Sequence, residues 1–119
     1  MSKKSISHSH AGFEEIRQTD EGGNEFWSAR DLAPLLDYPQ WRNFKPVIDK
    51  AVQACQQSAQ SVVDHFADIR KMVDLGSGAQ REIEDVQLSR YACYLIVQNG
   101  DPSKLVIANG QTYFALQTR

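Results

Sequence analysis

A repeat of apolar residues between positions 41 and 55 constrains the fold of this chain more than any other feature. Its members recur at spacings of three and four and are Trp41, Phe44, Ile48, Ala51, Val52 and Cys55. This spacing places side chains on one face of an α-helix and does not match the two-residue period of a strand. The sequence therefore predicts a long amphipathic helix, with a kink at Pro46 because proline lacks a backbone donor.

A shorter helix is predicted just before this repeat. Ser28 can accept a hydrogen bond from a backbone amide at the helix start, and Asp31 lies favourably near the positive end of the helix dipole. Pro34 is expected to distort the last turn, and residues 37–40, Asp-Tyr-Pro-Gln, are typical of a turn. Two helices joined in this way predict a unit like a helix-turn-helix, with a polar face free to enter a groove of nucleic acid.

The chain is expected to begin with a disordered tail followed by a short hairpin. Residues 1–12 are rich in serine, lysine and histidine and lack the apolar core of an export signal, so a cytoplasmic location is expected. Residues 13–18 and 25–28 flank a Gly22-Gly23 turn and predict two small strands. Residues 13–119 are expected to form one domain, because no linker or internal repeat divides them.

A second hairpin is predicted between residues 70–75 and 81–86, around the turn Gly76-Ser77-Gly78. A helical turn is the alternative at the start of this region, because helical spacing also relates Phe66, Ile69 and Val73. The glycine turn favours the hairpin, which would form a wing with basic residues near its tip.

Two helices are predicted in the last third of the chain. Ser89 can cap a helix through the apolar segment Tyr91–Val97, which we expect at the centre of the core. Gly100 is placed to end this helix in a left-handed conformation. Asp101-Pro102 has the pattern of a helix start, with aspartate as cap and proline at the first position, and predicts a last helix over Lys104–Arg119.

The distribution of charge limits the classes of partner. The net charge is −2, which argues against a protein that holds nucleic acid by bulk charge. Residues 14–37 carry seven acidic and two basic residues, whereas residues 38–60 carry three basic residues and one acidic residue. Any anion-binding face must therefore be local. Cys55 and Cys93 lack the spacing of a redox or zinc motif and are expected to be buried thiols.

Two groups of residues are the candidate contacts to nucleic acid, one on the long helix and one on the wing. The first group is Arg42, Asn43, Lys45 and Lys50, and the second is Arg70, Lys71 and Arg81. Basic side chains neutralise phosphates and so position a protein without reading base sequence. The alternative for the first group is an ordinary solvated helix face. The second group is crowded by the acidic residues Asp74, Glu82, Glu84 and Asp85.

Other polar and aromatic side chains have competing interpretations. Three aromatic residues are candidates for stacking on unpaired bases, although their helical spacing is more typical of a core: Trp41, Tyr91 and Tyr94. Arg30 and Arg90 follow the predicted cap serines and either face a partner or make local ion pairs, of which the second interpretation is preferred.

No pattern in the sequence indicates catalysis, a metal or a cofactor. Asp64 and His65 are adjacent, and neighbours in sequence rarely converge on one substrate, so His65 is expected to be buried and hydrogen-bonded. His8 and His10 have no further ligand nearby. The turn at residues 76–78 lacks the lysine of a phosphate-binding loop. We therefore expect neither an enzyme nor a metal or cofactor site.

Several strings of residues resemble the DNA-damage-inducible protein D family of bacteria. The longest is Leu88-Ser-Arg-Tyr-Ala-Cys-Tyr-Leu-Ile-Val-Gln-Asn-Gly-Asp-Pro102, which continues at residues 110–119, and shorter ones are Phe13-Glu-Glu-Ile16, Trp27-Ser-Ala-Arg30 and Asp64-His-Phe66. This family is similar to the BRO N-terminal and KilA-N domains of viral and phage proteins. The resemblance implies a small α+β fold with a helical DNA-binding core over residues 27–47. Members carry a further helical, charged region, so the chain resembles an N-terminal fragment.

The resemblance also implies a function. A member of this family would act in the bacterial SOS response and modulate recombination as a nucleic-acid-binding module, with the RecA filament on single-stranded DNA as a partner. The alternative is a protein-interaction module that binds RecA or a second copy of itself and has little affinity for DNA. Neither interpretation implies a membrane.

Overall fold

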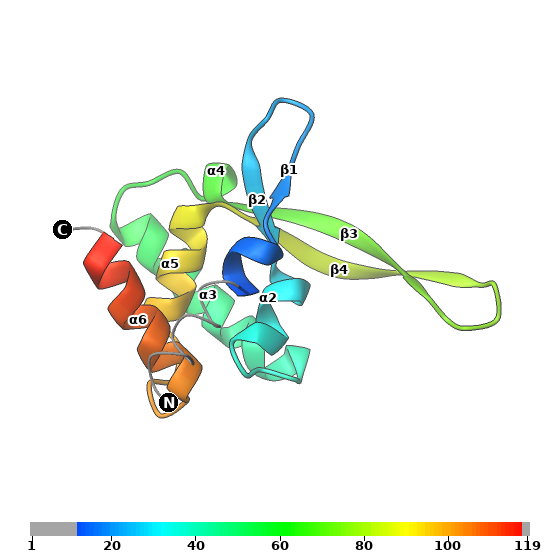
Figure 1. Ribbon diagram of the computed structural model, residues 1–119. Coiled ribbons are helices and arrows are strands. Elements are labelled where there is room, and N and C mark those ends of the chain that lie inside the picture. Colours follow the sequence, from blue (N-terminus) through cyan, green and yellow to red (C-terminus); the bar gives the residue numbers. More distant parts are fainter. Residues whose placement is uncertain (1–11, 118–119) are drawn as a thin grey trace.

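In the computed structural model, which describes residues 12–117, a group of helices packs beside a small antiparallel sheet (Figure 1). The labelled helices are α2 (Ala29–Leu35), α3 (Trp41–Gln57), α4 (Val62–His65), α5 (Arg90–Gln98) and α6 (Leu105–Gln117). The described strands are β1 (Gln18–Thr19), β2 (Glu25–Ser28), β3 (Phe66–Asp74) and β4 (Gln80–Leu88), in the sheet order β1-β2-β4-β3. The predicted α+β class is confirmed.

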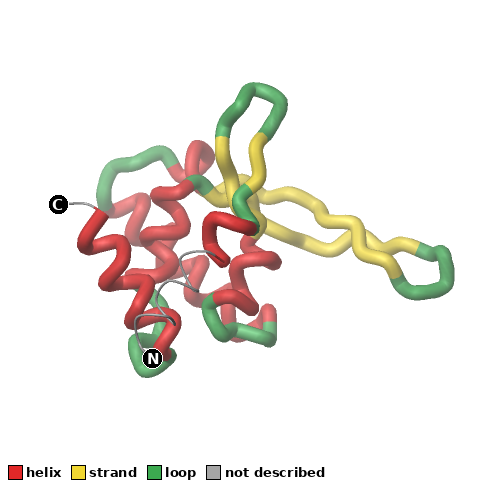
Figure 2. The backbone as a smooth tube through the Cα atoms, viewed as in Figure 1, coloured by secondary structure: helices red, strands yellow, loops and turns green. Residues whose placement is uncertain are grey.

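Strands β3 and β4 and their turn, residues 66–88, form a long hairpin that leaves the helical body and is called the arm below (Figure 2). Each strand has nine residues, and Phe66 pairs with Leu88 at the base. In the turn, Gly76 and Gly78 have φ angles of 86° and 82°, which glycine adopts without strain. The predicted wing is confirmed over its helical alternative, and both strands are longer than predicted.

Helices α2 and α3 form the predicted helix-turn-helix-like pair. The Ser28 hydroxyl caps α2 by accepting a hydrogen bond from the amide of Asp31 at 3.3 Å. Asp37 has a φ of 66° in the connecting turn. Helix α3 continues through Pro46 over 17 residues and turns its predicted apolar face to the core, where the buried residues are Phe44, Val47, Ile48, Ala51 and Cys55.

Helix α5 is the centre of the core, as predicted. Ser89 caps it by accepting from the amide of Ala92 at 3.0 Å. Its buried residues are Ala92, Cys93, Leu95, Ile96 and Val97, and both cysteines of the chain are free and buried. Within α6, Gly110 lets this helix approach α5 closely, because a Cβ there would lie 3.1 Å from Val97 Cγ1.

Two predictions about the end of α5 and the start of α6 were wrong. Gly100 does not adopt a left-handed conformation; its lack of a side chain instead makes room for Ile107, whose Cδ1 would lie 2.8 Å from an added Cβ. Helix α6 begins at Leu105 and not at Lys104. The Asp101 carboxylate accepts from the amide and hydroxyl of Ser103 at 2.9 and 2.7 Å, which closes a separate turn before the helix.

The first predicted strand was also wrong over most of its length. Residues 12–15 are helical, and only Gln18–Thr19 pairs with β2. The Phe13 ring stacks on Trp27 at 4.5 Å, and its carbonyl oxygen accepts from the Trp27 indole at 2.8 Å. This helical turn therefore presents both the ring and the carbonyl of one residue to the same tryptophan. The predicted tail falls largely outside the described residues.

Candidate nucleic-acid interface

The start of α3 lies against the base of the arm. Lys45 and Arg70, which belong to different predicted groups, line one polar cavity of about 270 Å³. The rest of its lining is Asp68, Ile69, Glu84 and Asp85. The fold therefore brings one residue of each predicted group together here and surrounds the two with acidic side chains.

Lys45 already has a counterion within the protein. Its Nζ donates to Asp49 Oδ1 at 2.8 Å, one helical turn further along α3. This hydrogen bond raises the pKa of Lys45 above its usual value, and the nearby charges of Glu84 and Asp68 raise it further. Lys45 stays charged, but a phosphate would have to compete with several carboxylates for it.

Lys50 does not share a face with Lys45. The two are five positions apart, which is about 140° around a helix of 3.6 residues per turn. Lys50 lines a separate open cavity with Gln53, Ala54, Gln57 and Asn99, on the side of α3 that faces the end of α5. Arg42 and Asn43 are exposed in the first turn of α3. The four predicted residues of α3 thus spread over more than one flank of the helix.

The strand register divides the arm into two faces of different character. Paired residues of an antiparallel ribbon lie on the same face, and faces alternate along each strand. The pairs Ala67↔Gln87, Ile69↔Asp85, Lys71↔Ile83 and Val73↔Arg81 lie on one face. Asp85 is buried near the base, so we name this face after its outer part and call it the basic–apolar face. The opposite face, called the acidic face, carries the pairs Asp68↔Val86, Arg70↔Glu84, Met72↔Glu82 and Asp74↔Gln80. Lys71 and Arg81 are therefore neighbours, and Arg70 is separated from them by the ribbon.

Lys71 links the arm to α2. Its Nζ lies 2.6 Å from Asp31 Oδ1, and 35% of each side chain is exposed. Ion pairs with this much exposure contribute about 0–1 kcal/mol, because water screens the attraction. The pair fixes the direction of the Lys71 side chain more than it stabilises the fold.

Asp85 anchors the arm to the helices, a role that no sequence pattern predicted. Its side chain is 2% exposed. It accepts hydrogen bonds from the Ser28 hydroxyl, from the Arg30 amide at 2.9 Å and from the Val86 amide at 2.7 Å. A carboxylate at the start of α2 also interacts favourably with the helix dipole. No local pattern distinguishes Asp85 from the exposed acids beside it, because its partners in α2 and its cap lie 55 and 57 residues away.

A second contact joins the arm to both helices of the pair. The Arg30 guanidinium donates from Nε to the Glu84 carbonyl at 2.8 Å and lies 4.0 Å from the centre of the Trp41 ring. The Trp41 indole donates to Glu84 Oε1 at 3.2 Å. Arg30 thus makes local interactions, and the arm, α2 and the start of α3 are held in one arrangement.

Four of the predicted basic residues keep their charge free of ion pairs. Within residues 12–117, no salt bridge involves Arg42, Lys50, Arg70 or Arg81, and all four are exposed. Cations without an internal partner are the ones that a phosphate can neutralise without displacing a carboxylate. What this arrangement can do chemically is bind an anionic polymer.

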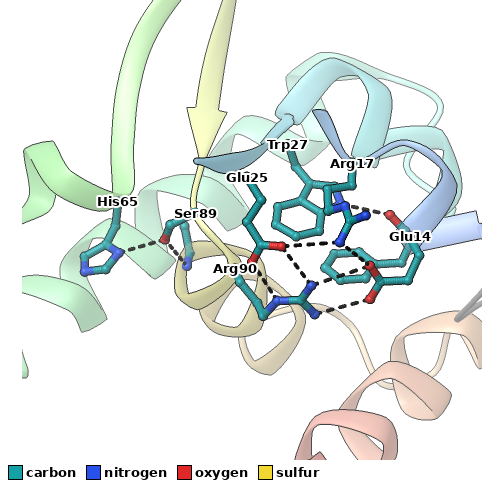
Figure 3. A network of polar contacts seen from close by, with 9 residues as sticks. Glu14, Arg17, Glu25, Trp27, His65, Ser89 and Arg90 are labelled. Carbon is teal, nitrogen blue, oxygen red and sulfur yellow. Dashed lines mark hydrogen bonds and ion pairs between the residues drawn. The ribbon is translucent and has the colours of Figure 1, made fainter. Parts of the chain in front are cut away.

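Arg90 serves the fold and is not a free cation (Figure 3). Its guanidinium donates to Glu25 at 2.9 Å and to Glu14 at 3.2 Å, and it lies 5.1 Å from the Trp27 ring centre. The hydrogen bonds to Glu25 and Glu14 raise the pKa of Arg90, and Arg90 in turn lowers the pKa of Glu25. The preferred interpretation of Arg90 as a local ion-pairing residue is confirmed.

The remaining candidate side chains are occupied by packing. Tyr91 packs edge-on against His65 at 4.8 Å, and Tyr94 packs edge-on against Phe114 at 5.5 Å. The Nδ1 atom of His65 lies 2.7 Å from the Ser89 hydroxyl, so the predicted hydrogen bond is present. The side chain is half-buried, whereas full burial was predicted. In the part of the chain that the structure describes, no group of three or more His, Cys, Asp or Glu side chains is arranged to hold a metal. The histidines at positions 8 and 10 lie outside it.

Among the described helices, none is long and apolar enough to cross a membrane. Comparison with known proteins gives a family and a relative. Residues 15–115 match the family described as BRO family, N-terminal domain. The chain is 54% identical over 114 residues to the DNA damage-inducible protein D of Escherichia coli strain K12, across 96% of this chain and 42% of that protein. The chain thus spans less than half the length of this relative. No solved structure matches it. The chain belongs to the BRO family, by its N-terminal domain.

Proposed function

We propose that this chain is a nucleic-acid-binding module that acts in the response to DNA damage. The observation that carries the proposal is that Arg42 on α3 and Arg81 on the arm are exposed and free of ion pairs among the described residues, while Arg70 lies on the opposite, acidic face of the arm. The similarity to a damage-inducible protein supports the cellular context. A helix-turn-helix-like pair with an adjacent arm is an arrangement that DNA-binding domains use.

Binding would position the protein on phosphates, without cleavage of any bond. The first turn of α3, with Arg42 and Asn43, would lie near the phosphate backbone of the nucleic acid, and the arm would add a second contact. Lys45 would contribute less than an unpaired lysine because of Asp49. The chain would occupy and remodel recombination intermediates, with the RecA filament as its protein partner and with no catalytic activity of its own.

An alternative function has one observation in its favour. The acidic face of the arm carries Glu82 and Glu84 and is exposed, and the net charge of the chain is −2. A basic protein surface would be attracted to this face. The chain would then bind RecA or a second copy of itself, and its contact with DNA would be secondary or absent.

Binding to labelled DNA over a salt series separates these functions. The affinity of the wild type should fall linearly on a logarithmic salt scale, with a slope of about −0.9 for each phosphate contact on duplex DNA. Arg42→Glu should weaken binding at least tenfold and make the slope shallower. Gln56→Glu is the control, because it adds negative charge at an exposed position at the far end of α3, outside both groups of candidate contacts.

Two results would contradict the proposal. One is the absence of measurable binding by the wild type at low salt, and the other is a slope that Arg42→Glu leaves unchanged. Co-sedimentation with RecA filaments and light scattering of the free chain would then test the alternative function directly.

A further inference from the structure

We infer that the nucleic acid this domain binds is duplex DNA, that the basic–apolar face of the arm enters its major groove, and that unpaired bases find no stacking surface on the domain. The inference rests on the proposed function and specifies its ligand. Three sets of observations carry it: the positions of the aromatic side chains, the shape of the arm, and the charge of its two faces.

Proteins that bind single strands usually stack bases on exposed aromatic rings. The chain has five phenylalanines, two tryptophans and four tyrosines. All of these residues lie within the described part of the chain, and each is buried or half-buried. Tyr91, Tyr94 and Tyr113 pack against other rings. The domain therefore offers no row of free aromatic faces along which a single strand could lie.

The two best-placed aromatic residues are also unsuited to stacking. The Arg30 guanidinium lies 4.0 Å from the centre of the Trp41 ring, and the Trp41 indole donates to Glu84. Phe26 lines a polar cavity of about 400 Å³, but Asp20, Glu25 and Asp64 line the same cavity. Three carboxylates would repel a phosphate backbone that brought a base to Phe26.

The arm has the shape that fits a groove of duplex DNA. It is a two-stranded ribbon with strands of nine residues, which corresponds to about 30 Å at 3.3 Å per residue. The major groove of B-DNA is about 12 Å wide and admits a two-stranded β-ribbon. β2 pairs with β4 only at Trp27↔Leu88 and Ser28↔Gln87, so no other described strand covers the rest of the arm. Figure 1 shows this part standing clear of the helices.

The two faces of the arm decide its orientation. Arg81 on the basic–apolar face is exposed and has no ion pair among the described residues. Lys71, which is held by Asp31, lies diagonally across the strands from it. Val73 and Ile83 lie on this face in the outer part of the arm, whereas Asp85, on the same face nearer the base, is buried against α2. Apolar side chains such as Val73 and Ile83 can contact thymine methyl groups. Turned the other way, the ribbon would point the carboxylates of the acidic face at the DNA.

Neighbouring residues on opposite faces provide a matched pair of variants. Arg81 and Glu82 are both exposed, adjacent in sequence and on different faces of β4. Fluorescence anisotropy would compare the wild-type chain, Arg81→Gln and Glu82→Gln on a labelled 30-base-pair duplex and on a labelled oligothymidylate of 30 nucleotides. Circular dichroism would verify that each variant is folded.

The expected result has two parts. The wild type should bind the duplex at least tenfold more tightly than the single strand at equal salt. On the duplex, Arg81→Gln should make the salt slope shallower by about 0.9, which is one phosphate contact, whereas Glu82→Gln should leave the slope unchanged and bind as well as or better than the wild type. Equal or tighter binding to the single strand would overturn the inference, and so would a loss for Glu82→Gln equal to that for Arg81→Gln. Binding to neither DNA would refute the proposed function itself, so the two failures are distinguishable.

Discussion

Replacement of Asp85 by alanine should destabilise the domain more than any other single change to an acidic residue of the arm. The side chain is buried and accepts from Ser28, Arg30 and Val86. A hydrogen bond to a charged group contributes about 1.5–3 kcal/mol, and the donors of Ser28 and Arg30 would lose their partner. Relief of the buried charge offsets part of this loss. We therefore expect the free energy of unfolding to fall by about 3 kcal/mol, a large share of the roughly 5–15 kcal/mol of a typical domain.

Urea denaturation, followed by circular dichroism and tryptophan fluorescence, measures this change. A loss of about 3 kcal/mol corresponds to a Tm lower by about 9–18 °C for a domain slightly longer than 100 residues. Asp68→Ala is the control, because the Asp68 side chain is exposed on the same arm and makes no hydrogen bond or ion pair among the described residues; a change within about 0.5 kcal/mol is expected there. Asp85→Asn keeps one acceptor oxygen and should fall between the two. The reasoning would be refuted by a loss below 1 kcal/mol for Asp85→Ala.

Further predictions concern the Arg90 network, a glycine and the thiols. Arg90 lowers the pKa of Glu25, so the stability that the ionised Glu25 contributes is complete at neutral pH and is lost as the pH falls through the lowered pKa. Between pH 7 and 3, the Glu25→Gln variant should therefore lose less stability than the wild type. The difference should be under about 1 kcal/mol, because the pair is exposed. Gly100→Ala should cost about 1–3 kcal/mol in thermal or urea unfolding, since its Cβ would overlap Ile107. Burial raises the pKa of the Cys55 and Cys93 thiols, so both should react with a disulfide reagent only in denaturant, and rapid reaction in buffer would contradict their burial.

The helices and the arm were predictable because their signals are local. The caps at Ser28 and Ser89 and the apolar face of α3 depend on residues within a few positions of one another. The Gly76-Ser77-Gly78 turn likewise identifies the hairpin from three residues. The local rule failed at Phe13, where a contact with Trp27 favours a helical turn over the predicted strand.

The candidate site was less predictable because it depends on contacts between distant segments. That Lys45 and Lys50 lie on different flanks follows from helical geometry, but the acids around Lys45 come partly from the arm. The two faces of the arm could be assigned only when the register of β3 and β4 was known. Gly100 shows the same limit, since the residue that requires a glycine there is Ile107 and not the local backbone.

The arrangement of charges explains how a domain with a net charge of −2 can bind an anionic polymer. Much of the acidic charge has an internal role: Glu14 and Glu25 hold Arg90, and Asp31 holds Lys71. The exposed acids of the arm lie on the face opposite Arg81, where they repel DNA that approaches from that side. Only a few cations then remain to contact phosphates, and each contact adds about 0.9 to the salt slope. The domain alone should therefore bind DNA weakly and in one orientation, and a higher affinity must come from a second binding surface.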